Sequence, residues 1–149
     1  MTNRNQIKQP KLVELYDYWQ SKRRGRRYPS RADIDPTEMK FILGNIDLVE
    51  ITCDPIVFTF RLSGSVIDRN EGFNMQGKTL DDYPLPEHRE AIKRTYLEAL
   101  RSGEPHYEEL DRVADDKLHR YGRLILPLSE DGKVIDMFLM GRIELKNRR

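Results

Sequence analysis

The chain has 149 residues, of which 38% are hydrophobic and 34% are charged, and its formal net charge is +1. This length suits one domain with a real core, and the nearly balanced charge predicts no nucleic-acid partner. The single cysteine, Cys53, excludes an intramolecular disulfide framework and fits a reducing cytoplasm. No signal peptide is evident, and no apolar run approaches the roughly 18 residues of a spanning helix. We therefore expect a cytoplasmic protein without membrane contact.

A helix is predicted close to the start of the chain, after a polar stretch over residues 1–9 that we expect to be a disordered tail. Pro10 opens this helix, and Gly25 follows the basic residues at its end. Four apolar residues share one face at helical spacing, namely Leu12, Leu15, Tyr16 and Trp19. A helix this short needs a surface that buries the stripe, either its own sheet or that of a second copy.

The segment after this helix contains a strong helix-start signal. Asp35 suits the N-cap, Pro36 suits the first helical position, and Glu38 is placed to close a capping box back to Asp35. The pattern predicts a short helix that runs to about Leu43 and ends at Gly44. So much local chemistry at one boundary indicates that this junction is fixed in space.

The middle of the chain is predicted to form two strands and then helices. Residues 46–52 and 56–62 are the strand candidates, and the Asp54-Pro55 pair between them indicates a tight turn. In the second strand, the residues expected on one face are Ile56, Phe58, Phe60 and Leu62. Short helical turns over residues 65–80 precede a long helix that starts at Pro86, runs to about Arg101 and ends at Gly103.

The last third is predicted to be sheet. Strands are expected over residues 106–113, 121–128 and 134–143, and the first of them is acidic enough to suit a sheet edge. Residues 146–149 are expected to be a disordered tail. Two hairpins separated by a helical crossover indicate an α+β domain with an antiparallel sheet of five strands and helices on one face. The other face needs the N-terminal helix, or a second chain, as its cover.

This order of elements resembles a PAS domain. A second likeness is to a family of small PAS-like proteins found mainly in alphaproteobacteria. The N-terminal residues that carry it are Tyr18, Trp19, Arg24, Gly25, Arg26, Pro29, Arg31, Asp33, Ile34, Asp35 and Pro36. Two strand segments are also similar to that family, residues 58–65 and 123–128. The resemblance implies one PAS-like domain over residues 10–145, a role in sensing or relaying signals, and a dimeric state.

The same resemblance implies where a ligand would lie. PAS-like proteins that bind ligands hold them between the sheet and the long helix, and the apolar stripes of this chain converge there. The candidate pocket residues are Phe60, Ile92, Tyr96, Leu126 and Phe138. Core packing alone also accounts for these side chains. A one-residue error in strand register would move any of the strand residues to the opposite face.

The sequence does not identify a cofactor. Flavin photoreceptors of this fold carry a reactive cysteine in an Asn-Cys-Arg-Phe context on a helix, whereas Cys53 ends a predicted strand before Asp54-Pro55. Haem-binding versions use an axial histidine, and His88 at the start of the long helix is the one candidate. A surface or capping role is the simpler interpretation of His88, although haem stays open.

The charged clusters have simple structural interpretations. The structural or interaction motif that we single out comprises Trp19, Arg26, Arg31, Asp33 and Asp35. Its acidic and basic members would form a ligand clamp or, as we favour, salt bridges and caps that fix the segment to the sheet. The arginine-rich run at residues 22–27 is expected to be a helix terminus and a solvated turn rather than a phosphate site. The carboxylate pairs at residues 81–82 and 115–116 do not by themselves build a metal site.

The sequence therefore predicts a non-catalytic, PAS-like sensory or regulatory module. The leading hypothesis is small-molecule sensing coupled to contacts with a partner protein or a second copy. A protein-interaction adaptor with a filled core and no ligand is the second, and an α+β enzyme is the third. Because the N-terminal stripe needs a cover, we expect a two-fold homodimer in which that helix takes part.

Overall fold

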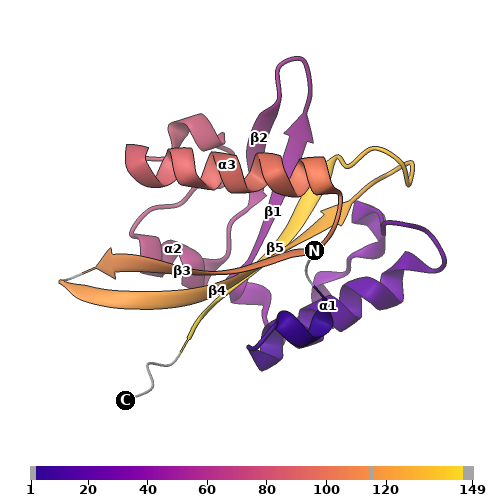
Figure 1. Cartoon of the computed structure of the whole chain (residues 1–149), viewed down its shortest axis with the longest axis horizontal. Helices are drawn as coiled ribbons and strands as arrows, with labels where there is room; N and C mark the ends of the chain where they lie inside the picture. Colours follow the sequence, from indigo (N-terminus) through magenta and orange to yellow (C-terminus); the bar gives the residue numbers. More distant parts are fainter. Residues whose placement is uncertain (1–2, 115, 146–149) are drawn as a thin grey trace.

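The computed structural model describes residues 3–114 and 116–145, which form one sheet with helices on both of its faces (Figure 1). The longer elements, in chain order, are α1 (Pro10–Arg23), β1 (Ile46–Thr52), β2 (Val57–Leu62), α2 (Ser65–Glu71), α3 (Pro86–Ser102), β3 (His106–Ala114), β4 (Lys117–Leu128) and β5 (Met137–Glu144). One short 3-10 helix precedes α1, at Arg4–Gln6, and others lie between the longer elements, at Arg31–Asp33, Pro36–Glu38, Leu43–Asn45 and Leu80–Asp82.

The sheet has five strands in the order β2-β1-β5-β4-β3, and every neighbouring pair is antiparallel. The α+β class and the antiparallel sheet are thus confirmed. The acidic strand β3 lies at one edge, as its composition predicts. The first and last strands in sequence, β1 and β5, pair in the middle of the sheet, so the two hairpins are joined along the core of the domain.

Helix α3 covers one face of the sheet (Figure 1). It starts at Pro86 and ends at Gly103, whose φ of +68° is the left-handed conformation that glycine favours at a helix C-terminus. Its inner side buries Tyr96, whose ring meets the ring of Phe58 at 5.3 Å and that of Phe138 at 5.9 Å between centroids. These edge-to-face contacts join the helix to β2 and β5.

Helix α1 covers the opposite face. Its residues Leu12 and Leu15 are fully buried over Gly122 of β4 and Gly141 of β5, where a Cβ atom at position 141 would lie 2.7 Å from Leu15 Cδ2. Trp19 is also buried, and its Nε1 donates a hydrogen bond of 2.8 Å to the backbone oxygen of Pro127. The small residues on the strands therefore let the helix approach the sheet closely.

The apolar stripe of α1 is buried within the same chain. Leu12, Leu15 and Trp19 lie against the chain's own sheet, and Tyr16 is partly buried beside them. The stripe is consequently not available to a second copy. The stripe therefore gives no reason to expect a homodimer. The homodimer itself stays a prediction that the structure of one chain does not test.

Two strands begin later than predicted, because the first residues expected in them lie in turns. Ile56 is 45% exposed and lies in the turn before β2, so it does not share the inner face with Phe58 and Phe60. The last strand begins at Met137 rather than at Val134, because the Asp131 carboxylate accepts hydrogen bonds from the backbone of Lys133 and Val134 and holds them in the loop.

The prediction of a disordered tail over residues 1–9 is wrong for residues 3–9. Arg4–Gln6 forms a 3-10 helix capped by Asn3, and the Arg4 guanidinium pairs with Asp17 of α1 at 2.8 Å. Ile7 is buried in the core, which fixes the segment to the domain. The other predicted tail, residues 146–149, lies outside the described residues.

Candidate functional site

A small cavity lies on the α3 face of the sheet. Its volume is about 40 Å³, enough for about three water molecules at roughly 10–15 Å³ each. The residues that line it come from both hairpins, α2 and α3: Asp47, Phe60, Ser63, Ile67, Asp68, Glu71, Phe73, Met75, Tyr83, Ile92, Tyr96, Arg123, Met140 and Arg142. One side of the cavity is therefore apolar and the other carries charged groups.

Three of the five residues predicted to line a pocket border this cavity, namely Phe60, Ile92 and Tyr96. Phe138 is fully buried next to it, with its ring against Tyr96. Whether any of these four binds a ligand stays a prediction.

Leu126 does not reach the cavity. It pairs with Leu139, while its neighbour Ile125 pairs with the cavity residue Met140, so alternation places Leu126 on the α1 face. Both Leu126 and Ile125 are fully buried, because each face of β4 is covered by a helix. Because this part of β4 is apolar on both faces, its sequence does not alternate between polar and apolar residues. The sequence therefore does not show which of its residues face α3.

The charged residues of the cavity were not predicted from the sequence. Asp47, Arg123 and Arg142 each stand within an apolar strand and are 6–8% exposed. A charge at an inward-facing position of a buried strand was the signal that could have found them, because such residues are rarely buried without a partner.

Ion pairs hold both arginines. Arg123 and Arg142 stand directly opposite each other on β4 and β5, where two like charges would repel. Each has its own carboxylate partner: Arg123 pairs with Glu108 of β3, and Arg142 pairs with Glu71 of α2. Burial favours the neutral form of Glu108, but hydrogen bonding from His106 and the charge of Arg123 lower its pKa to about 2. Glu108 therefore stays ionised at neutral pH.

Asp47 is a buried acidic group of the cavity that forms no ion pair with an arginine among the described residues. Its carboxylate accepts a hydrogen bond of 3.1 Å from the Gly64 N–H. Burial raises the pKa of Asp47 to about 7, the nearby Asp68 adds to the rise, and Arg142 and Arg123 oppose it. Asp47 therefore changes charge within the physiological range.

Asp47→Asn is expected to change how stability depends on pH. Because the folded-state pKa of Asp47 is about 7, above the value of 3.8 for a solvated aspartate, its contribution to stability is full below pH 3.8 and is lost as pH rises through 7. The difference between wild type and variant should shift by about 3 kcal/mol in favour of the variant from pH 5 to pH 8, at about 1.4 kcal/mol per pH unit below the folded pKa.

Urea unfolding of both proteins at the two pH values measures this shift. His88, whose pKa is lowered by burial and by Arg112, acts in the opposite direction but is common to both proteins and cancels in the difference. A difference that is the same at both pH values would contradict the assignment.

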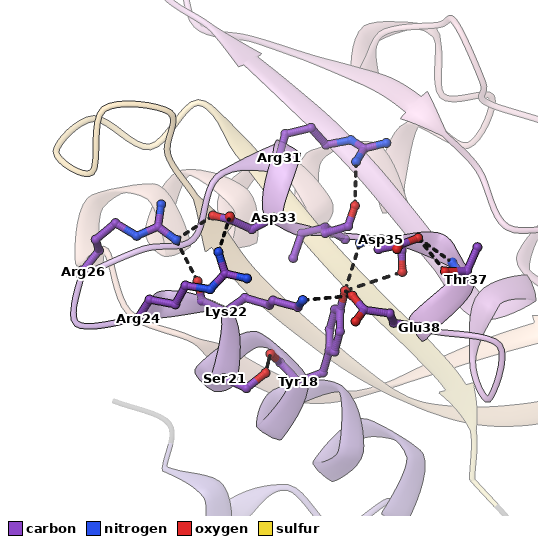
Figure 2. A network of polar contacts seen from close by, with 11 residues as sticks. Tyr18, Ser21, Lys22, Arg24, Arg26, Arg31, Asp33, Asp35, Thr37 and Glu38 are labelled. Carbon is purple, nitrogen blue, oxygen red and sulfur yellow. Dashed lines mark hydrogen bonds and ion pairs between the residues drawn. The ribbon is translucent and has the colours of Figure 1, made fainter.

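A second polar cluster joins α1 to the segment that follows it, and Figure 2 shows its contacts. Arg26 pairs with Asp33 at 2.7 Å, and Arg24 approaches the same carboxylate at 3.6 Å. The Asp33 carboxylate also accepts a hydrogen bond of 2.8 Å from the Ser30 N–H, and these bonds lower the pKa of Asp33 to about 2. Ser30 and Asp33 thus form a capping box.

Asp35 acts as an N-cap, but its partner differs from the predicted one. Its carboxylate accepts from the Thr37 N–H at 2.9 Å, whereas Glu38 turns away to accept from the Tyr18 hydroxyl at 2.8 Å and to pair with Lys22 at 2.9 Å (Figure 2). The predicted capping box is wrong, because the Glu38 carboxylate binds Tyr18 and Lys22 of α1 instead of the Asp35 backbone. The helix is also one 3-10 turn, Pro36–Glu38, and does not run to Leu43.

Arg31 does not join the ion pairs of this motif. Its guanidinium donates to the backbone oxygen of Ile34 at 3.1 Å, while Asp33 and Asp35 are engaged elsewhere. The salt bridges and caps that we predicted are present, but they join the segment to α1 and its C-terminal turn rather than to the sheet, which Trp19 contacts through Pro127. An interaction role for these residues stays a prediction. A ligand clamp formed by Arg31, Asp33 and Asp35 has no support in the arrangement.

Asp35→Ala is expected to destabilise the protein modestly. The variant removes the acceptor for the Thr37 N–H and leaves the Tyr18 contact to the Asp35 backbone in place. Thermal unfolding should show a small fall in midpoint, and Asp35→Asn, which keeps a capping oxygen, should recover most of it. An unchanged midpoint for Asp35→Ala would mean that the cap does not stabilise the segment.

The cavity is too small for the flavin or haem considered above. A flavin ring system or a haem is far larger than a cavity of about 40 Å³. Cys53 is exposed in the turn after β1, and His88 is not among the residues that line the cavity. The residues present therefore do not fit either group.

Within residues 3–114 and 116–145, no group of three or more His, Cys, Asp or Glu side chains is placed to hold a metal ion. In the same part of the chain, no helix is both long and apolar enough to cross a membrane.

Solved structures share the fold. A LOV protein from Rhodobacter sphaeroides matches with a TM-score of 0.52 and 14% identity, over 95% of this chain and 70% of its own. A sensory box sensor histidine kinase from Vibrio cholerae matches with a TM-score of 0.53 and 18% identity, over 75% of this chain and 90% of its own. At these identities the likeness concerns the fold alone. No curated protein matches the chain.

A family model described as a PAS domain matches residues 7–140, a range that includes α1 and both hairpins and ends within β5. The sheet order, the helix across one face and the cavity beneath it agree with that match. The chain therefore belongs to the PAS domain family.

Proposed function

We propose that this PAS domain is a non-catalytic signalling sensor that binds a small molecule in the cavity beneath α3. The observation that carries the proposal is the placement of buried charged groups around a void rather than around packed side chains. Asp47, Arg123 and Arg142 are buried there at a cost that packing alone would avoid. A site with an apolar wall and a few convergent polar groups is typical of small-molecule pockets.

The signal would pass from the cavity through the sheet and its helices to a protein partner. The cavity touches both hairpins, α2 and α3, so a ligand would contact elements from most of the domain. We further propose that the partner is a signalling protein or a second copy of this chain in a homodimer, in the cytoplasm. Sedimentation of the full chain at high micromolar concentration tests the homodimer, and a purely monomeric protein would overturn it.

A protein-interaction adaptor without a ligand is the second candidate. The observation that favours it is the small size of the cavity, together with the close packing of Phe58, Tyr96 and Phe138 beside it. Under that alternative the charged groups would only fix the positions of α2 and β3 on the sheet.

A thermal-shift screen with a cavity-filling variant separates the two candidates. Ile67 is buried and lines the cavity, so Ile67→Phe should occupy the void, while Ile56→Phe places the same change on an exposed turn residue. A ligand that binds only the folded state raises the unfolding midpoint with concentration. The proposal expects a compound that stabilises wild type and Ile56→Phe but not Ile67→Phe. Stabilisation that is equal in all three proteins, or absent across a panel of small metabolites, would favour the adaptor.

A further inference from the structure

Two buried guanidinium groups in the cavity have hydrogen-bond donors without an acceptor. The side chains of Arg123 and Arg142 are 8% and 9% exposed. The Nε atom of each is buried and has no hydrogen-bond partner among the described residues. A buried donor without an acceptor lowers the stability of the folded state, and native proteins contain few such donors. An unpaired donor of this kind therefore indicates that a further acceptor can bind there.

The two donors belong to one place in the fold. Arg123 and Arg142 are paired positions on adjacent antiparallel strands, where facing Cβ atoms lie about 4.5–5.5 Å apart. Both residues line the cavity. One of the two terminal nitrogens of each donates to a carboxylate, that of Glu108 for Arg123 and that of Glu71 for Arg142. The free Nε–H groups are thus left beside a common space.

The carboxylates around this space are bound to groups other than the two Nε–H donors. Glu71 and Glu108 accept from terminal nitrogens of the arginines, Asp47 accepts from the Gly64 N–H, and Asp68 accepts from the Ser63 hydroxyl. Arg112 of β3 is a half-buried arginine close to the other two, and its Nε also lacks a partner among the described residues. The cavity therefore has three arginine donors beside it that an anionic acceptor would satisfy.

The opposite wall of the cavity is apolar. Phe60, Ile67, Met75 and Ile92 line it, and all four side chains are buried. The volume of about 40 Å³ admits only a few non-hydrogen atoms. A ligand that suits both walls has an anionic head and a very short hydrocarbon end.

We propose that Arg123 and Arg142 bind the carboxylate of a short monocarboxylic acid, with acetate and propionate as its representatives, while the alkyl end lies against Ile67 and Ile92. This inference rests on the proposed function and names the chemical class of the ligand. The carboxylate oxygens accept hydrogen bonds from the two Nε–H groups and supply the acceptors that the protein does not.

Nuclear magnetic resonance of the arginine Nε–H groups in the ¹⁵N-labelled full chain tests the proposal. Sodium propionate, added up to about 50 mM, should move two arginine signals in a saturable way, because a ligand this small binds no tighter than roughly the micromolar range and this concentration also covers much weaker binding. Sodium chloride at equal ionic strength and propionamide, a neutral molecule of the same shape, are the controls and should leave these signals in place. Arg61, which is exposed and paired with Glu50, provides an internal reference.

Arg123→Lys and Arg142→Lys identify the two signals, since lysine keeps the charge and has no Nε–H. If either variant fails to fold, the titration of wild type with its two controls still tests the proposal, although the signals are then not assigned to individual residues. Ile67→Phe should abolish the shifts, and Ile56→Phe should retain them. Signals that do not move with propionate, or that move equally with chloride or propionamide, overturn the proposal. If another compound then stabilises wild type but not Ile67→Phe, the proposed function stands and only the ligand class is wrong.

Discussion

Trp19→Ala is expected to destabilise the protein by about 3–5 kcal/mol, the usual cost of removing a buried aromatic side chain. The indole is 2% exposed between α1 and the sheet, and its Nε1–H is bonded to the backbone oxygen of Pro127. The variant creates a cavity and removes the donor from a buried carbonyl at the same time. Chemical denaturation, with the free energy of unfolding extrapolated to water, measures the loss.

Trp19→Phe separates packing from hydrogen bonding in the same contact. Phenylalanine keeps most of the ring volume but has no N–H, so the expected loss is about 1–3 kcal/mol, the cost of an unsatisfied buried acceptor. If both variants unfold at the wild-type denaturant concentration, α1 does not support the sheet and its assigned position is wrong.

Glu71→Gln is the second change with a large expected effect. The substitution keeps the shape of the side chain and an oxygen that can accept from Tyr83, but it removes the ion-pair partner of the buried Arg142. Removing one partner of a buried ion pair typically costs about 3–5 kcal/mol. Both side chains of the pair are less than 10% exposed, so solvent screening does not reduce this value much.

An exposed ion pair supplies the matched control. Glu50→Gln breaks the pair with Arg61, whose side chain is 54% exposed, and should hardly move the unfolding midpoint. The double variant Glu71→Leu with Arg142→Met removes both charges and should recover most of the stability that Glu71→Gln loses. Equal midpoints for Glu71→Gln and Glu50→Gln would show that the Glu71 pair is not buried in solution.

The elements of this fold could be predicted where local signals were strong. Pro10 and the helical spacing of Leu12, Leu15 and Trp19 mark α1, and Gly103 marks the end of α3. Phe58 and Phe60 alternate with polar residues and give the inner face of β2 correctly. In these segments the local chemistry and the tertiary contacts favour the same structure.

The cavity could be predicted only in part. Leu126 and Ile125 are both apolar and buried, so nothing local decides which of them faces α3. Arg123 and Arg142 look like ordinary surface charges until the register of β4 and β5 places them side by side beneath the helices. Long-range pairing, which a single sequence does not reveal, decides both points.

The N-terminal motif shows tertiary contacts overriding a local signal. Asp35, Pro36 and Glu38 have the pattern of a capping box, and Asp35 does cap the turn. Glu38 instead binds Tyr18 and Lys22, which lie one helix earlier in the chain. The same motif therefore fixes α1 to the loop.

A high-resolution crystal structure of the purified protein in the presence of propionate tests carboxylate binding at the cavity most directly. The account predicts electron density for a bound molecule beneath α3, with oxygen atoms within hydrogen-bond distance of Arg123 Nε and Arg142 Nε. Ordered water alone in the cavity at saturating propionate, or a cavity closed by Phe60, Ile67 and Met140, would contradict it.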